Sequence, residues 1–198
     1  LSLHDALPIF SSTTYNLAMY AMDKKNIIFR DSNYFNLNGG SSSHRGMEVD
    51  LEHSFNSMVS VSFSGTYAIH RYTNDPFDQG INNDNFVSNR DNDIDTAPRL
   101  FGGARLLISP SSKSNVEVEW TRTGRYYLDP ENLHSYGGHT LVNVRGRYDI
   151  LPALQLFARL TNLTNQKYAS RADYTSFSGL RYFPGMPSQV AVGFKVTW

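Results

Sequence analysis

Apolar and polar side chains alternate along most of the sequence, in segments of about ten residues. The clearest segment is the last one, residues 188–198, in which every second side chain is apolar: Val190, Val192, Phe194, Val196 and Trp198. Successive side chains of a β-strand point to opposite faces of a sheet, so this alternation predicts a strand with one apolar and one polar face. Because the pattern recurs along the chain, we expect an all-β protein.

The connections between these segments alternate between short and long. Short turns are predicted at residues 23–26, 56–57, 110–113 and 151–153. Long loops are predicted near residues 37–44, 73–96, 124–138 and 169–187. Short turns at one end and long loops at the other are typical of an antiparallel transmembrane β-barrel of the bacterial outer membrane. A soluble β-sandwich is the alternative, but its long loops have no reason to gather at one end.

Composition excludes several other classes of protein. Lys and Arg together number 18, as do Asp and Glu, so the chain has no basic footprint for nucleic acid. It has no cysteine, and therefore neither disulfides nor a thiolate metal site. A membrane-spanning helix needs roughly 20 consecutive apolar residues. The apolar run at residues 100–108 is shorter and contains Arg105, so no such helix is expected.

The alternation gives about nine strands, an odd number, whereas single-chain bacterial barrels have even numbers. An open sheet edge in lipid would leave backbone groups unpaired, at several kcal/mol each. We therefore interpret residues 11–198 as the C-terminal portion of a barrel, open as given, with further strands before residue 11. Residues 1–10 (LSLHDALPIF) lack the features of a signal peptide and resemble a translated sequencing adapter, so we predict that they are non-native.

The last sixty residues carry the most specific motif. Residues 160–168 (LTNLTNQKY) resemble the "NL-[FT]-[DN]-x-x-Y" signature near the end of TonB-dependent outer-membrane receptors. A Pro-Gly-x-Pro stretch (residues 184–187) and a final alternating strand follow at the spacing of that family. Residues 136–145 resemble the family's entry into an earlier strand, and residues 15–20 and 45–49 do so more loosely.

This resemblance implies an orientation and a set of partners. The C-terminus and the short turns would be periplasmic, and the long loops would be extracellular. The family's plug domain and the N-terminal segment that contacts the TonB complex have no counterpart here. The remaining partners would be outer-membrane lipid, a small-molecule ligand and the barrel-assembly machinery. That machinery would read the terminal aromatic strand, with Phe194 and Trp198 as the assembly signal.

Aromatic and basic residues cluster in the predicted loop at residues 124–138. Arg125, Tyr126 and Tyr127 stand together, and Tyr136 recurs at the far end. One interpretation is an interfacial girdle of aromatic rings at headgroup depth. The other is a surface that stacks on and ion-pairs with an anionic ligand. On the polar face, four arginines are expected to pair with Glu117, Glu119 and Asp149 or to contact a plug: Arg105, Arg145, Arg147 and Arg159.

The sequence predicts no metal ion, cofactor or catalytic residue. His44, His70, His134 and His139 show no HExxH or paired spacing. Residues 91–95 begin like a calcium loop, but Thr96 replaces the turn glycine and no glutamate follows at the twelfth position. We therefore expect a solvated acidic loop there. No nucleophile elbow or phosphate-binding glycine motif is present.

The predicted function is active uptake of a scarce ligand, such as a ferric siderophore, through the outer membrane and driven by the TonB complex. A barrel enzyme (a lipase or protease) and a passive porin are the alternatives. A soluble all-β binding domain is a further one. The resemblance implies no covalent chemistry, and the sequence does not identify the ligand.

Overall fold

The computed structural model describes residues 12–30, 36–74 and 88–198. Within these ranges, no helix is long and apolar enough to cross a membrane. The regular elements there are β-strands, in chain order β1 (Thr13–Arg30), β2 (Asn36–Ser54), β3 (Val59–Tyr72), β4 (Leu100–Ser111), β5 (Ser114–Thr123), β6 (Tyr126–Tyr127), β7 (Ser135–Tyr136), β8 (His139–Leu151), β9 (Leu154–Thr161), β10 (Ala169–Thr175), β11 (Gly179–Pro184) and β12 (Gln189–Val196).

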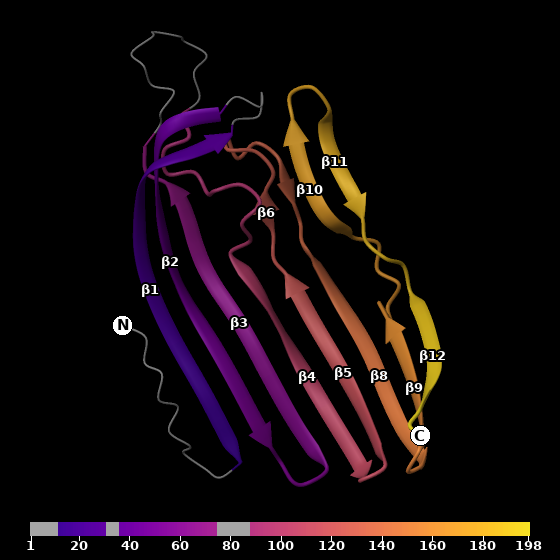
Figure 1. The fold of residues 1–198 in the computed structure, drawn as a ribbon. Helices are drawn as coiled ribbons and strands as arrows, with labels where there is room; N and C mark the ends of the chain where they lie inside the picture. The colour runs from indigo at the N-terminus through magenta and orange to yellow at the C-terminus, as the bar shows by residue number, and fades with distance from the viewer. Residues whose placement is uncertain (1–11, 31–35, 75–87) are drawn as a thin grey trace.

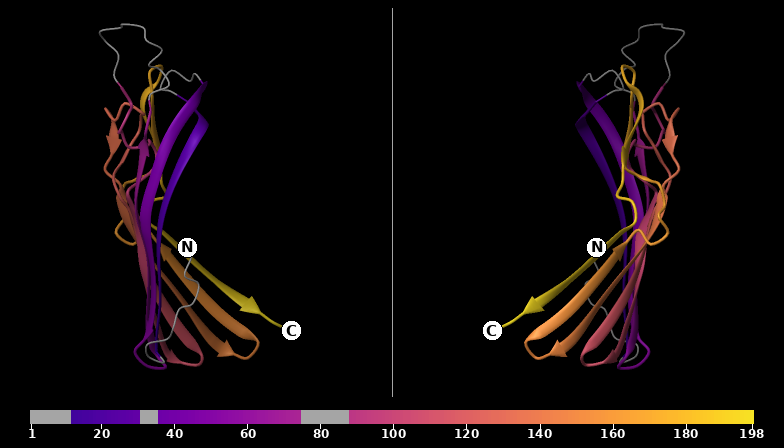
Figure 2. Two further views of the ribbon diagram at one scale, coloured as in Figure 1. Left: turned by 90° about the vertical axis from the view of Figure 1, so that its left-hand side faces the viewer. Right: turned by 90° about the vertical axis from the view of Figure 1, so that its right-hand side faces the viewer.

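Eight of these strands form one antiparallel sheet in the order β1-β2-β3-β4-β5-β8-β9-β12. Figure 1 shows them side by side from indigo to yellow, and the two side views in Figure 2 show a single twisted layer. The short strands β6 and β7 pair with each other, as do β10 and β11. The predicted all-β, antiparallel fold is confirmed.

Strand register places the alternating side chains in continuous rows across the sheet. One row of the apolar face runs over six strands: Val61, Leu106, Val118, Val144, Leu160 and Val190. The adjacent row of the polar face carries Glu52, Ser62, Arg105, Glu119 and Asn143. A one-residue slip would exchange the two faces, so this agreement across neighbouring strands fixes their register.

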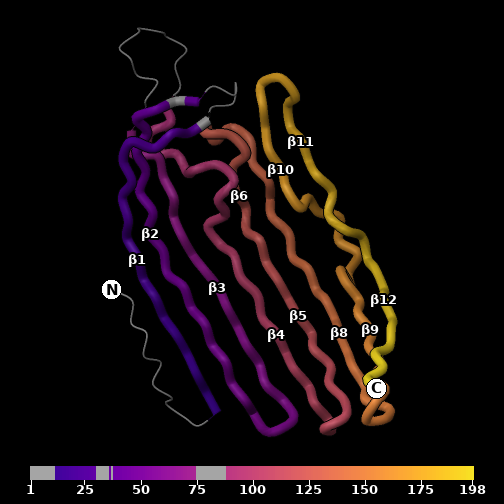
Figure 3. The backbone as a smooth tube through the Cα atoms, viewed as in Figure 1, coloured from indigo at the N-terminus to yellow at the C-terminus, as the bar shows by residue number. Residues whose placement is uncertain are grey.

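The two ends of the sheet differ as predicted (Figure 3). The turns between β2 and β3, β4 and β5, and β8 and β9 are short and lie at one end, which we call the turn end. The connections between β3 and β4, β5 and β8, and β9 and β12 are long and lie at the other end, the loop end. Three predicted turns and the predicted loops at residues 124–138 and 169–187 are thus confirmed; of the loop predicted at residues 73–96, residues 75–87 lie outside the described ranges.

The first hairpin differs from the prediction. β1 continues through the predicted turn at residues 23–26, and β2 contains the predicted loop at residues 37–44. Asp23 pairs with Ser43 and Lys25 with Ser41, so the ladder satisfies these polar residues' backbone groups. The turn-like composition instead marks a bulge, because the register shifts after Lys25 and Asn26 has a φ of 56°. Both predictions were wrong.

The number of strands also needs correction. Two predicted strands are the single strand β1, so the main sheet has eight strands rather than about nine. The odd number is therefore not found among the described residues, but the prediction of an open sheet is confirmed, because β1 and β12 form its two edges and do not pair with each other. Residues 1–10 lie outside the described ranges, and the division at residue 11 stays a prediction.

Buried side chains gather at the loop end, in the long connections and in the adjoining parts of β2 and β3. Leu128, Ala169 and Ala172 form a core cluster between the long connections. The sheet is one layer thick, and its apolar face is exposed: Val192 is 73% and Phe194 69% accessible. An apolar surface of this extent on a folded protein indicates a lipid or protein partner.

Candidate functional site

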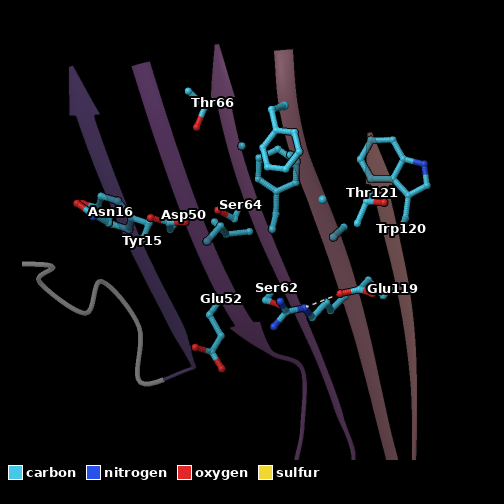
Figure 4. Close-up of a pocket in the computed structure, with 18 of the residues that line it drawn as sticks. Tyr15, Asn16, Asp50, Glu52, Ser62, Ser64, Thr66, Glu119, Trp120 and Thr121 are labelled. Atoms are coloured by element: carbon cyan, nitrogen blue, oxygen red, sulfur yellow. Dashed lines mark ion pairs between the residues drawn. The ribbon is translucent and has the colours of Figure 1, made fainter. Parts of the chain in front are cut away.

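The polar face of the sheet contains a shallow hollow over β1–β5 (Figure 4). Its lining combines apolar side chains with carboxylate, amide and hydroxyl groups, among them Asn16, Asp50, Glu52, Ser62, Ser64 and Glu119. These residues alternate with apolar ones along each strand, so polar groups gather there as a direct consequence of register. Water can solvate the polar groups that line the hollow. Among the described residues, it brings together no set of side chains that could hold a metal ion.

Ion pairs link the polar face across β4, β5 and β8. Arg105 lies 3.4 Å from Glu119, and Arg145 contacts Glu117 at 3.0 Å and Glu119 at 3.3 Å. These contacts confirm the predicted pairing for two of the four arginines. Asp149 instead accepts a hydrogen bond from Gln155 at 2.6 Å. For Arg147 and Arg159, the described part of the chain offers no ion-pair partner, and contact with a plug stays the alternative.

At the loop end, Asp93 fastens the connection after β3 to its neighbours. Arg99 donates two hydrogen bonds of 2.7 Å to its carboxylate, and Arg71 lies 3.6 Å away. The Asp93 backbone N–H donates to Asn132 Oδ1, and Asn132 Nδ2 donates to the Asp93 carbonyl, both at 2.8 Å. The bidentate pair of Arg99 with the Asp93 carboxylate is among the stronger polar contacts in proteins. Asp93 therefore joins two loops that are far apart in sequence.

Asp95 is held in the same connection. The Tyr72 hydroxyl donates a 2.7 Å hydrogen bond to Asp95 Oδ1. Burial raises the pKa of Asp95 despite that hydrogen bond. The prediction of a solvated acidic loop was wrong for Asp93 and Asp95, because both carboxylates accept hydrogen bonds from side chains of the protein.

A tight turn after β6 joins this assembly to the hairpin of β10 and β11. Buried Asp129 accepts hydrogen bonds from the backbone N–H groups of Leu133 (2.8 Å) and His134 (3.0 Å), and it also contacts the His134 ring. The His134 ring stacks on Tyr174 of β10, with centroids 3.8 Å apart and planes 13° from parallel. The loop end is thus one packed unit of three connections.

The predicted aromatic residues are brought together within that unit. β6 and β7 pair Tyr126 with Tyr136, whose ring centroids are 5.4 Å apart. Both rings pack on the core cluster of Leu128, Ala169 and Ala172. The Tyr136 hydroxyl accepts from the Ala169 N–H and contacts His139 Nδ1, both at 3.1 Å. Burial raises the pKa of Tyr126.

Arg125 directly precedes β6, and its side chain lies against that of Tyr127. The Arg125 side chain is exposed, and its guanidinium lies 5.2 Å from the centre of the Tyr127 ring. A second basic group lies on the neighbouring hairpin, where Arg171 and Arg181 pair with Asp173 at 2.8 and 2.6 Å. The loop end therefore presents guanidinium groups held over aromatic rings and against carboxylates.

The model of the TonB dependent receptor-like β-barrel family matches residues 7–163. The chain belongs to this family. It is also 26% identical, over 163 residues, to the ferrichrome outer membrane transporter/phage receptor of Escherichia coli K12. That match covers 77% of this chain and 20% of the transporter.

Solved structures of similar fold include two receptors. The siderophore receptor PiuA of Acinetobacter baumannii matches 93% of this chain with a TM-score of 0.75 and 15% identity. The ferric yersiniabactin uptake receptor FyuA of Yersinia pestis matches 94% with a TM-score of 0.76 and 14% identity. The chain spans 26% and 28% of their lengths, respectively. It is thus a TonB-dependent receptor barrel segment of the bacterial outer membrane.

Sequence reasoning missed the residues that fasten the loops. Asp93 and Asn132 are 39 positions apart, and nothing in the sequence links them. The sequence Asp129-Pro130 followed by Asn132 is typical of a turn and could have predicted this one. Among the histidines, His44 lies in β2 rather than in a loop, opposite His70 of β3. Within the described residues, no group of three or more His, Cys, Asp or Glu side chains could hold a metal ion.

Proposed function

We propose that this chain forms part of the barrel wall and extracellular loops of an active transporter for a scarce ligand such as a ferric siderophore, driven by the TonB complex. One observation carries the proposal: the three long connections form a single packed unit that exposes guanidinium groups. Similar proteins named for ferrichrome and ferric yersiniabactin uptake support it. Ferric siderophores are commonly anionic, and arginine suits their carboxylate and catecholate oxygens.

Within this unit we assign different roles to the four predicted ligand residues. Arg125 and Tyr127 would contact the ligand, since the guanidinium is exposed and aligned over the ring. Tyr126 and Tyr136 would support that surface, because their rings pack on the core cluster. Uptake would need no covalent chemistry, and capture would depend on charge and shape at the loop end.

The variant Arg125→Ala is expected to weaken ligand capture by about tenfold, because a charge-assisted contact contributes about 1.5 kcal/mol. The measurement is uptake of radioactive iron by whole cells, supplied as ferric hydroxamate, catecholate and carboxylate siderophores over a range of concentrations. The control Lys113→Ala removes a cation at the turn end and should leave uptake unchanged. Equal uptake by the parent and Arg125→Ala receptors for every transported compound would refute the assigned role.

The same assay separates active transport from the alternatives. Uptake should be lost in cells that lack a functional TonB complex. Uptake that persists there, and that continues to rise with ligand concentration, would identify a passive porin instead. Release of cleaved product from an ester or peptide substrate would identify a barrel enzyme.

Phe194 and Trp198 are proposed as the signal for the barrel-assembly machinery. Both side chains are exposed, at 69% and 105%, on the edge strand and directly beyond it. Deleting Trp198 should lower the amount of receptor in the outer membrane several-fold, measured by heat-modifiable mobility of outer-membrane fractions. Trp198→Phe keeps a terminal aromatic ring and should assemble normally. Normal assembly of the deletion variant would exclude this role.

A further inference from the structure

His44 and His70 form a cross-strand pair at the loop end of the polar face. They are register partners on β2 and β3, and their Nδ1 atoms are 2.9 Å apart. Met22 of β1 is in turn the register partner of His44, so the three side chains share one row on one face. We propose that this row is a binding site for a divalent ion that prefers square-planar geometry, Cu²⁺ or Ni²⁺. This inference does not depend on which compound the receptor transports.

The choice of ion rests on the types of ligand, and the separation of the two nitrogens agrees with it. Metal–imidazole bonds of 2.0–2.1 Å and a 2.9 Å nitrogen separation correspond to an angle of about 90° at the metal. A tetrahedral ion would need the nitrogens about 3.3 Å apart. Neighbouring positions in a square plane are typical of Cu²⁺ and Ni²⁺, and an imidazole site binds Cu²⁺ most tightly among divalent first-row ions.

The second ring nitrogen of His44 already makes a hydrogen bond, as the second nitrogen of a metal-binding histidine usually does. His44 Nε2 lies 2.9 Å from Ser42 Oγ, and Ser42 is 1% exposed. When Nδ1 binds a metal, Nε2 carries the proton and donates it to an acceptor, which here is the serine hydroxyl. The buried serine therefore holds the ring orientation and can accept the Nε2 proton that metal binding at Nδ1 requires. Without metal, one Nδ1 donates a proton to the other; on binding, that ring takes the tautomer with its proton on Nε2, so two neutral imidazoles bind without net proton release.

The remaining donors set the character of the site. The thioether of Met22 is a soft ligand that suits copper. Two imidazoles and one thioether leave positions open for water or for donor atoms of a small chelator. Lys24 lies two residues further along β1 on the same face, so its positive charge would oppose a bound cation. Binding should therefore tighten when that charge is removed.

The experiment is a titration of the detergent-purified receptor with copper(II) chloride in a weakly chelating glycine buffer. Calorimetry and electron paramagnetic resonance measure the binding. The parent receptor should bind one equivalent of Cu²⁺ with a signal split by two imidazole nitrogens. His44→Ala and His70→Ala should each weaken that equivalent by at least about tenfold. His53→Ala, in β2 near the turn end, should retain it. Lys24→Gln should bind severalfold more tightly.

Other outcomes would overturn the proposal. Unchanged Cu²⁺ binding in both histidine variants would place the copper elsewhere, and absence of a bound equivalent in the parent would show that the pair is only a hydrogen bond. Zn²⁺ binding as tight as Cu²⁺ would refute the right-angle geometry. Heat-modifiable mobility checks that each variant is folded. His44→Gln and His70→Gln replace the alanine variants if those fail to fold, because glutamine can keep a cross-strand hydrogen bond.

Discussion

Asn162→Ala should destabilise the receptor by about 4 kcal/mol, because three buried hydrogen-bonding groups lose their partner at once. Asn162 is 0% exposed. Its Nδ2 donates to the carbonyls of Gln166 (2.9 Å) and Met186 (3.0 Å), and its Oδ1 accepts from the Gln166 N–H (2.9 Å). The side chain therefore joins the end of β9 to the segment that delivers β12. Its loss should loosen the closing strand.

Backbone conformation adds to this effect. Asn162 has a φ of 52°, a left-handed conformation that asparagine tolerates better than alanine. Asn165 separates the two causes, because it has a φ of 48° but an exposed side chain with one hydrogen bond, from the Ser188 N–H. Asn165→Ala should cost about 1 kcal/mol. The measurement is urea unfolding of the refolded receptor in lipid vesicles, and equal losses for the two variants would contradict the role of buried hydrogen bonds.

The faces of the sheet could be predicted from the sequence, because period-two alternation is a local property of each strand. Val190, Val192 and Phe194 lie on one face in the structure, as their spacing requires. The first hairpin could not be predicted in the same way. Asp23 and Lys24 lie on opposite faces of β1 and are both polar, since that part of the hairpin lies at the loop end. Composition alone does not distinguish a polar strand from a turn.

The contacts of the candidate site depend on residues that the chain brings together from a distance. Tyr126 and Tyr136 were recognisable as an aromatic cluster, but their packing on Ala169 and Ala172 depends on the hairpin after β9. The pairing of His44 with His70 similarly needs the register of β2 and β3 over 26 positions. Sequence reasoning therefore found the residue types of the site but neither their partners nor their roles.

Val118→Arg should destabilise the barrel by about 3 kcal/mol, because it places a charge on the lipid-facing side near the middle of β5. Val118 lies between Leu106 and Val144 in the row that crosses six strands. No side chain of that row can neutralise a guanidinium, since all six are aliphatic. The charge would have to be buried in hydrocarbon or drawn toward the headgroups, which thins the bilayer. Urea unfolding in lipid vesicles measures the loss.

The matched control is Thr121→Arg, which adds the same side chain to the same strand on the opposite face. Thr121 pairs with Gly103 and Leu141 and lines the polar hollow, where water solvates a cation. Its arginine variant should change stability by less than about 1 kcal/mol. The difference between the two variants therefore reports which face meets lipid. Equal losses, or a larger loss for Thr121→Arg, would mean that the two faces of the sheet have been assigned the wrong way round.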